Sequence, residues 1–368
     1  MSILDWSEEG LLDGLEGEAR EARVKLLDEL HSGGVSLEEL TRAAAEGRLM
    51  FLPVERALGE EPRYSAREVA EQSGLDYDFM ISQWRALGLP ANDPDVVAYG
   101  ERDLDAARRV KQFLDAGLPP EGVIEMARVM GRAMARVAEA SRYLMGRAFL
   151  APGATEYDVA QQARLVRPLT DLMEPTLAHV FNLQLVEQLR HEVMDRAQLE
   201  KGTVGQREMA ICFADLVGWT ELGEESEDET IGTVADRLAS MTTELLRPPV
   251  QVVKLIGDAA MLVSPDQGPL LDVALDLVAL ADDEPGFPQL RAGIASGEAL
   301  SRWGDWYGRP VNLASRVCSR ARPGSVLVTG PVMEACDEDG YRFSAAGEKR
   351  LKGIGQVPLW RARRAESA

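Results

Sequence analysis

The stretch from Val252 to Val263 constrains the fold more than any other part of this sequence. It reads VVKLIGDAAMLV, so two apolar runs flank the pair Gly257-Asp258. Aliphatic and β-branched residues favour strands, and a two-residue link containing glycine is typical of a hairpin turn. The stretch therefore predicts a β-hairpin that carries the Asp258 carboxylate at its tip. An ordinary surface turn is the alternative interpretation, because aspartate tolerates turn geometry in many proteins.

Length and charge limit the classes of protein that this chain can belong to. The chain has 368 residues, of which 45% are hydrophobic, and this favours two or three domains with substantial cores. The formal net charge of -21 opposes nonspecific binding to nucleic acids and to anionic membranes. The sequence has no apolar run long enough to span a bilayer and no signal-peptide pattern, so we expect a cytoplasmic protein.

The three cysteines give no sign of a disulfide framework or a zinc site. Cys212, Cys318 and Cys336 have no paired spacing, and each lies among apolar residues. We therefore expect them to be buried and reduced, as small hydrophobic residues of the core.

Residues 1–200 are predicted to form an all-helical domain. Ala, Leu, Glu and Arg recur there at three- and four-residue spacing, and glycine and proline pairs separate the segments. Three helix starts carry a Ser or Thr followed three residues later by an acidic residue: Ser36, Ser65 and Thr155. From about 155 to 200 we expect connecting helices that Pro168 and Pro175 kink or divide. The domain ends at a short break, Lys201–Gly205.

The segment 64–116 introduces a second class of function. Its residues YSAREVAEQSGLDYDFMISQWRALGL resemble the helix-turn-helix of MerR-type regulators, with Gly74 at the turn and Trp84 in the second helix. Residues 62–115 nevertheless contain seven basic residues against ten acidic ones. A helix that enters a DNA groove needs basic side chains, so the charge balance argues against binding to nucleic acid. A DNA-binding regulator is kept as the alternative function.

Two features of the helical half are candidates for regulation. His179 and His191 lie in the last connecting segment. Histidine titrates close to physiological pH, so this pair is a candidate pH switch, and two solvated histidines without a sensing role are the alternative. The many Leu, Val and Met side chains also allow the hypothesis that this half holds a lipid or fatty acid in an apolar pocket.

Beyond residue 206 the periodicity changes to alternating strands and helices, which continue to about residue 364. Strands are predicted at 209–216, in the hairpin, at 290–299, at 325–329 and in a closing pair from 341, and helices at 220–246, 269–281 and 310–321. This order predicts a sheet covered by helices, in an α+β sandwich of the ferredoxin-like type.

A second carboxylate stands at the end of the first of these strands, in the run FADLVGWT. If that strand neighbours the hairpin, Asp215 and Asp258 can share two divalent cations, which prefer oxygen ligands. The backbone N–H groups from Leu216 to Thr220, which include those of Gly218 and Trp219, lie at a helix start and offer a cradle for phosphate.

Three motifs together resemble the catalytic domain of class III nucleotidyl cyclases. They are ICFADLVGWTEL, VVKLIGDAAMLV and GDWYGRPVNLASRVCSRARPGSVLV, and they occur in the family's order within about residues 206–362. The helical half resembles the regulatory domain of the soluble, autoinhibited and pH-responsive mycobacterial adenylyl cyclases. The resemblance implies an adenylyl cyclase that converts ATP to 3',5'-cyclic AMP and pyrophosphate, under the control of its N-terminal domain.

The resemblance also implies metal-binding and base-reading residues. Asp215 and Asp258 match the two aspartates that bind two Mg2+ or Mn2+ ions, and the Leu216 carbonyl is a further candidate ligand. Lys254 and Asp305 match the pair that reads the adenine base. Guanylyl cyclases carry other residue types at these two positions, so the resemblance implies ATP as the substrate in preference to GTP.

The remaining implied residues act on the phosphates and the ribose. Asn312 and Arg316 match the transition-state pair, and their i,i+4 spacing places both on one face of a helix. Lys352, in the run RLKGIG, is similar to the lysine that holds the triphosphate. In the family, one catalytic domain supplies the metal ligands and another supplies the remaining residues. Because this chain carries each position once, a homodimer with two composite sites is implied.

Overall fold

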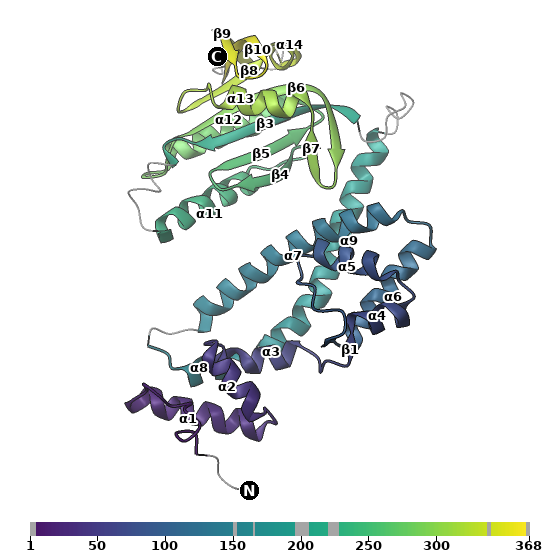
Figure 1. Ribbon diagram of the computed structural model, residues 1–368. Helices are drawn as coiled ribbons and strands as arrows, with labels where there is room; N and C mark the ends of the chain where they lie inside the picture. The colour runs from purple at the N-terminus through teal and green to yellow at the C-terminus, as the bar shows by residue number, and fades with distance from the viewer. Residues whose placement is uncertain are drawn as a thin grey trace. The chain divides into compact units, whose positions relative to one another are not determined.

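The computed structural model describes residues 5–149, 153–164, 166–195, 206–219, 228–336 and 340–365 (Figure 1). The chain divides into two compact units, Met1–Val193 and Met194–Ala368. The predicted boundary at 201–205 lies outside the described residues, so it stays a prediction. None of the described helices is both long and apolar enough to cross a membrane.

The first unit is helical, with one short two-stranded sheet. Its elements in chain order are α1 (Gly17–Ser32), α2 (Leu37–Ala45), η1 (Leu49–Phe51), α3 (Leu52–Leu58), β1 (Tyr64–Ser65), α4 (Ala66–Ser73), α5 (Tyr77–Ala86), β2 (Val97–Tyr99), α6 (Glu101–Asp115), α7 (Pro120–Phe149), α8 (Glu156–Ala163) and α9 (Val166–Asp195). The pairing of β1 with β2 was not predicted, because strands of two and three residues are too short to show a period-2 pattern.

The predicted helix starts are confirmed. The Ser36 hydroxyl accepts a hydrogen bond from the N–H three residues later. Ser65 with Glu68, and Thr155 with Asp158, form complete capping boxes in which each side chain satisfies the other's backbone N–H. These contacts fix where α2, α4 and α8 begin.

The helical unit contains two separate hydrophobic cores. One gathers α1, α2, η1, α3 and α8 around buried side chains that include Leu27, Leu40 and Ala160. The other gathers α4, α5 and α6 around side chains that include Met80 and Leu104. The helix-turn-helix motif belongs to the second core and is present as α4, a left-handed turn at a glycine, and α5.

Helix α9 is continuous for 30 residues. The segment is therefore not divided at Pro175, which lies inside the helix. A proline in a helix removes one backbone hydrogen bond, and a helix of this length keeps many others. Pro168 lies in the first turn of α9, where its missing N–H costs nothing.

The second unit is a mixed α/β sheet with helices on both faces. Its strands are β3 (Gln206–Leu216), β4 (Gln251–Ile256), β5 (Ala259–Ser264), β6 (Leu290–Arg302), β7 (Asp305–Tyr307), β8 (Ser325–Thr329), β9 (Tyr341–Leu351) and β10 (Gly355–Arg364), and its helices are α11 (Asp228–Glu244), α12 (Gln267–Asp283), α13 (Arg309–Cys318) and α14 (Gly330–Cys336). The strand order is β4-β5-β3-β6-β8-β10-β9, and β7 pairs with β6. Only β6 and β8 are parallel among the described pairs. This architecture confirms the predicted fold class.

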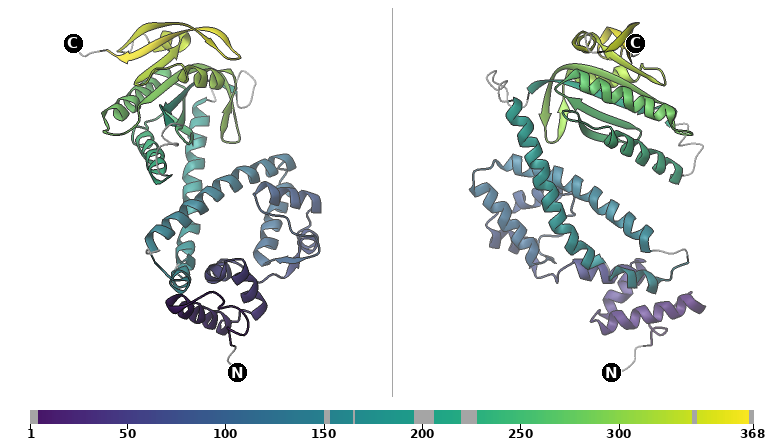
Figure 2. Two further views of the ribbon diagram at one scale, coloured as in Figure 1. Left: turned by 60° about the vertical axis from the view of Figure 1, so that its left-hand side comes forward. Right: turned by 180° about the vertical axis from the view of Figure 1, so that it is seen from behind.

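Strand β3 shows how the two faces of the sheet are specified. Its even-numbered side chains, such as Cys212 and Leu216, pack into the core beneath α11 and α12, whereas Met209 and Ile211 face α13. Seen from behind, α11 and α12 lie side by side over their face (Figure 2). The three cysteines are free and buried, as predicted.

Candidate active site

The predicted hairpin is present and brings two carboxylates together. Gly257 has a φ of 58° in the turn between β4 and β5, a left-handed value that glycine adopts without steric cost. β5 pairs with β3 so that Asp215 lies opposite Ala259. The Leu216 N–H donates to the Asp258 carbonyl at 2.9 Å, which fixes the turn against the end of β3. The predicted proximity of Asp215 and Asp258 is therefore confirmed.

Charge and burial shape this carboxylate pair. Burial raises the pKa of Asp258, and the charge of Asp215 raises that pKa further. The Arg291 guanidinium donates to Asp215 through its Nε, at 2.9 Å, and through its Nη2. Burial and the charge of Asp215 also raise the pKa of the nearby Cys318 thiol to about 12, so this thiol is not ionised at neutral pH. The two carboxylates thus form a partly buried, negatively charged site, and the Arg291 guanidinium lies beside one of them.

Arg291 was missed by the sequence reasoning. It is the second residue of β6 and the only charged side chain in the run LRAGIA. A single arginine in an apolar strand was the signal that could have identified it, because a charge in such a strand needs a partner.

The predicted base-reading pair is in direct contact. Lys254 Nζ, on β4, donates to Asp305 Oδ2, at the start of β7, at 2.5 Å. The Trp306 N–H donates to the other carboxylate oxygen of Asp305 at 2.8 Å, which holds the carboxylate in place. Both side chains are about one-third exposed, so a ligand can reach them.

The predicted transition-state and triphosphate residues line one hollow of about 450 Å³. Asn312 and Arg316 reach it from α13, and Lys352 reaches it from the turn between β9 and β10. Arg309, Gly353 and Ile354 complete the lining. Three cationic groups and no anionic group line this hollow in the described part of the chain, which suits phosphate. Arg309 was not predicted, because a basic residue at the start of a helix carries no signal of its own.

The predicted phosphate cradle is only partly described. Gly218 follows the end of β3 with a φ of 77°, and the Val217 N–H donates to the Gln289 carbonyl at 2.9 Å. Trp219 is half-buried and packs against the core beneath α12. The Leu216 N–H donates to the Asp258 carbonyl, so the N–H groups of Leu216 and Val217 are both engaged within the chain and do not belong to a phosphate cradle. Thr220 lies outside the described residues, so a cradle formed by residues 218–220 stays a prediction.

The two candidate regulatory histidines lie on α9. His179 is exposed. The side chain of His191 lies outside what the structure describes, so a switch made by this pair is not tested.

The site residues of one chain thus form three groups. The carboxylates at the end of β3, the Lys254–Asp305 pair and the α13 hollow are each formed by side chains in mutual proximity. Neither metal-site carboxylate is among the described residues that line the hollow.

The comparisons with known proteins cover both units. Residues 4–192 match the model of the adenylate cyclase regulatory domain, and residues 204–361 match that of the adenylate and guanylate cyclase catalytic domain. A pH-sensitive adenylate cyclase from Mycobacterium tuberculosis is 42% identical over 364 residues, which cover 96% of this chain and 91% of that protein. The chain belongs to the adenylate cyclase family.

Other relatives agree with this assignment. An adenylate cyclase from Streptomyces griseus is 33% identical over 278 residues, which cover 74% of this cyclase and 68% of that one. Among solved structures, the adenylyl cyclase CyaB from P. aeruginosa matches with a TM-score of 0.39 and 19% identity, over 44% of this chain and 95% of that one. Because residues 204–361 match the catalytic-domain model, the catalytic unit of this cyclase is the half that contains the three groups of site residues.

Proposed function

We propose that this cyclase converts ATP to 3',5'-cyclic AMP and pyrophosphate at two equivalent sites of a homodimer, with Mg2+ or Mn2+ as cofactor. The observation that carries the proposal is the proximity of Asp215 and Asp258 at the end of β3, in a unit that also presents a cationic hollow. Two carboxylates and a separate phosphate-binding surface are what a metal-assisted phosphoryl reaction requires.

The residues at the end of β3 fit a pair of hard divalent cations. Asp215 and Asp258 supply carboxylate oxygens, and the Leu216 carbonyl follows directly along the chain. The described residues hold no cluster of three or more metal-binding side chains, and Mg2+ often takes only one or two carboxylates together with substrate phosphates and water. When bound, the cations would acidify the ribose 3'-hydroxyl and offset negative charge on the phosphates.

Each residue of the chain then has a defined task. Asp215 and Asp258 would hold the cations, and Arg291 donates to Asp215 and so fixes the position of that carboxylate. Lys254 donates to a ring nitrogen of adenine and Asp305 accepts from the amino group, so ATP replaces their mutual contact. This exchange of one polar contact for two gives the site its preference for the adenine base.

The hollow beside α13 supplies the remaining tasks. Arg316 stabilises the negative charge that develops around the α-phosphorus, because its guanidinium offers several donors in a fixed plane. Asn312 orients the ribose from the same helix face, and Lys352 holds the triphosphate. Arg309 lines the same hollow and adds a further cation for the phosphates.

A homodimer is proposed because neither Asp215 nor Asp258 is among the described residues that line the α13 hollow of its own chain. The Asp215–Asp258 pair of one chain would complete a site with the base-reading pair and the α13 hollow of its partner, as the family resemblance implies. C2 pairing makes two such sites equivalent. Lys254 and Asp258 of one hairpin would then serve different sites.

Regulation by the helical unit is part of the proposal. The name of the M. tuberculosis relative supports a response to pH, for which His179 and His191 are the candidates in this chain. Autoinhibition, a lipid or fatty acid held by the helical unit and a cytoplasmic location are retained as proposals. Identical pH–activity profiles for the wild type and a His179→Gln/His191→Gln variant would reject the role of these histidines.

The direct test of the proposed reaction uses the full chain. The protein is incubated with ATP and either Mg2+ or Mn2+ across a range of pH, and the nucleotide products are separated and identified. We expect cyclic AMP and pyrophosphate in equal amounts, only when a divalent cation is present, and little cyclic GMP from GTP. The absence of cyclic AMP with both metals at every pH would contradict the proposed function.

DNA binding remains the second candidate because the helix-turn-helix is formed as α4 and α5. The α5 sequence opposes it, since Asp76 caps the helix, Asp78 occupies its first turn and Arg85 is its only basic residue. A mobility-shift assay at low salt tests this function, and no shift at micromolar protein would remove it.

A further inference from the structure

The hairpin formed by β9 and β10 is basic in an otherwise acidic protein. Residues 341–364 contain seven Lys or Arg residues and one Glu, whereas the whole chain has a net charge of -21. The proposed reaction uses only Lys352, in the turn between the two strands. The other six basic residues lie along the strands, and their positions decide which face of the sheet each charge reaches.

Cross-strand pairing gathers three arginines on one face of the sheet. Arg342 on β9 lies directly opposite Arg363 on β10, so their side chains point to the same face. Arg361 is two residues from Arg363 and therefore lies on this face too, roughly 7 Å farther along β10. Leu359 shares the face and packs in one core with Val317 of α13, so we call it the α13 face.

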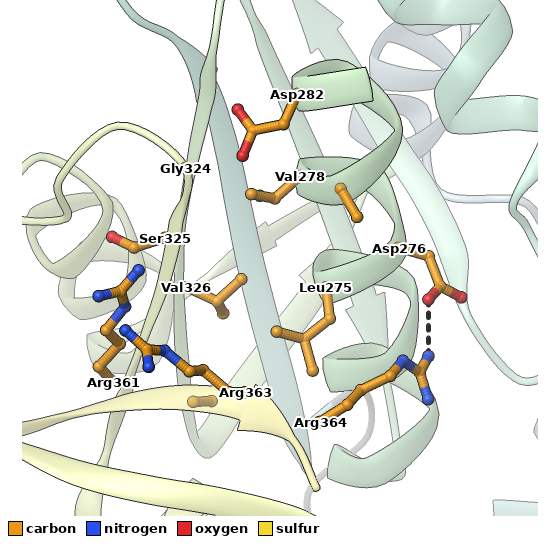
Figure 3. A pocket seen from close by; sticks show the side chains of 12 residues that line it. Leu275, Asp276, Val278, Asp282, Gly324, Ser325, Val326, Arg361, Arg363 and Arg364 are labelled. Atoms are coloured by element: carbon orange, nitrogen blue, oxygen red, sulfur yellow. Dashed lines mark hydrogen bonds and ion pairs between the residues drawn. The ribbon is translucent and has the colours of Figure 1, made fainter. Parts of the chain in front are cut away.

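The alternate residues of β10 point to the opposite face, which we call the α12 face. Ala362 belongs to the core beneath α12. Arg364 lies on the same face and pairs with two acidic side chains of α12, one of which is Asp276 (Figure 3). The same view shows the guanidinium groups of Arg361 and Arg363 beside each other, away from that contact. The charges of the α12 face are thus paired within the chain.

The arginines of the α13 face differ, because they have no acidic partner among the described residues. A fourth arginine joins them from the segment between α13 and β8, and we call the four the arginine cluster: Arg322, Arg342, Arg361 and Arg363. Neither an ion pair nor a side-chain hydrogen bond links any of the four to another described residue. Burial lowers the pKa of Arg361, and the charges of Arg363 and Arg322 lower that pKa further, so these groups lie close enough to repel one another. The Nε of Arg361 is buried and has no hydrogen-bond partner in the described part of the chain.

The arginine cluster is separate from the proposed catalytic hollow. Arg361 is six residues beyond Gly355, where β10 begins next to the turn that carries Lys352. An extended strand rises about 3.3 Å per residue, which places Arg361 roughly 20 Å along the strand from that turn. None of the four arginines is among the described residues that line the hollow. The proposed reaction therefore does not account for the cluster.

The arrangement of the cluster fits an anion that carries several charges. Like charges directly opposite each other destabilise a sheet, and a buried donor without a partner costs free energy, so the cluster is unfavourable without an anion. Phosphate oxygens suit guanidinium groups best, because they accept several donors from the planar fork at once. The charges extend about 5 Å across the strands and about 7 Å along them, which exceeds one phosphate group. We propose that the arginine cluster binds an oligophosphate, a chain of two or more linked phosphates, outside the active site.

The test measures binding of inorganic tripolyphosphate to the full-length protein by calorimetry, without metal and at about 0.15 M salt. The starting protein is the Arg316→Gln/Lys352→Gln variant, so that the catalytic hollow does not contribute. We expect tripolyphosphate to bind at one site per chain and more tightly than inorganic phosphate. Adding Arg342→Gln/Arg363→Gln to this background should weaken binding at least tenfold. Both of these arginines are exposed, so their replacement carries little risk to the fold.

A matched control removes the same number of charges from the other face of the same two strands. Arg350 lies opposite Gln356, next to residues of the α13 face, so the alternation of β9 places it on the α12 face together with Arg364. Arg350→Gln/Arg364→Gln in the same background should change the affinity by less than about twofold, because salt screens distant exposed charges. ATP without metal is the second probe. Binding as tight as that of tripolyphosphate would identify nucleotides as a source of the ligand, and weaker binding would identify free oligophosphate.

Several results would overturn the proposal. They are no binding of tripolyphosphate at millimolar concentration, an affinity no higher than that for inorganic phosphate, and equal affinities of the two variants that remove charges from opposite faces. Binding that the wild type shows and the catalytic-hollow variant lacks would assign the oligophosphate to the hollow and would also overturn it. Because the measurement does not depend on turnover, its outcome is independent of whether the chain produces cyclic AMP.

Discussion

The helical unit and the catalytic unit are held together in different ways. The helical unit has two small separate cores, and polar side chains link α1 to α8: Glu29 accepts hydrogen bonds from Tyr157 at 2.6 Å, from Gln161 at 2.9 Å and from Arg164 at 2.6 Å. The catalytic unit has one sheet with buried side chains on both faces. The sheet is therefore suited to hold charged groups in fixed positions, and the helical unit is suited to rearrange.

Helix α12 of the catalytic unit and helix α9 of the helical unit show the same contrast. Helix α12 buries an apolar face that includes Leu277, which is fully buried. Among the side chains of helix α9 that the structure describes, eight large apolar ones are exposed, including Leu183, which is 57% exposed. Burial of apolar area is the main source of stability, so α12 contributes to the stability of a single chain. The exposed apolar side chains of α9 contribute little to that stability and could pack against another protein surface.

The largest expected effect is on activity, and it comes from a substitution in the catalytic unit that should not lower stability. We expect Asp258→Asn to lower kcat by at least about 10²–10³-fold, since it removes one of the two carboxylates that would hold the cations beside the reacting phosphates. The pKa of Asp258 is higher in the folded protein than in the unfolded chain, because burial disfavours the ionised carboxylate. Its neutral form therefore contributes stability below the unfolded-state pKa, and this contribution is lost as the pH rises through the folded-state pKa. At pH 7.5 the Asn variant should therefore have an equal or higher Tm.

The control for this variant is Asp266→Asn, just after β5, which should leave both kcat and Tm unchanged. A variant at Asp258 that loses Tm while it keeps its activity would contradict the assignment of this carboxylate to a metal site.

The second prediction compares the two helices. Leu277→Ala should destabilise the catalytic sheet by about 2–5 kcal/mol, as expected for a buried leucine that leaves a cavity. Leu183→Ala on α9 should change stability by less than about 0.5 kcal/mol. Native-state hydrogen exchange of the β3 and α9 amides measures both. A large loss of stability in Leu183→Ala would show that α9 is covered in solution, and would contradict the contrast between the buried face of α12 and the exposed face of α9.

The smallest expected effect concerns the polar link between α1 and α8. The Tyr157 hydroxyl is the main cause of the lowered pKa of Glu29. A lowered carboxyl pKa contributes stability above the unfolded value, near 4.5, which is lost as pH falls through the folded value. Tyr157→Phe should make this loss begin at higher pH and cost less than about 1 kcal/mol, because the link is largely exposed.

Hydrogen exchange of α1 and α8 between pH 4 and pH 7 measures this shift. Tyr143→Phe, at an exposed tyrosine of α7, is the matched control and should leave the profile unchanged. If the two variants have the same profile, Glu29 does not hold the helices together.

The sequence predicted those parts of the fold that depend on local patterns. The β4–β5 hairpin followed from a Gly-Asp pair between two apolar runs, and the starts of α4 and α8 followed from Ser65 and Thr155 with their acidic partners. The continuity of α9 through Pro175 did not follow, because the local sequence does not show that the remaining hydrogen bonds of a long helix outweigh the one that a proline removes. The short pairing of β1 with β2 was missed for want of a periodic signal.

The residues of the candidate site also differ in how far the sequence could predict them. Asp258 was found from the hairpin motif that carries it. The i,i+4 pair of α13 was found from the resemblance to the cyclase family, and its spacing along the chain places both residues on one helix face. Arg291 and Arg309 were missed, because each acquires its role only from a neighbour that is distant in sequence.

The central claim is that each active site takes its metal-binding carboxylates from one chain and Arg316 from the other. The most direct measurement is the cyclic AMP activity of co-expressed Asp258→Ala and Arg316→Ala chains, carrying different tags so that the mixed dimer can be purified. Each variant alone should be inactive. The mixed dimer has one intact site of two and should regain about half of the wild-type activity. A purified mixed dimer as inactive as either variant alone would contradict the composite site.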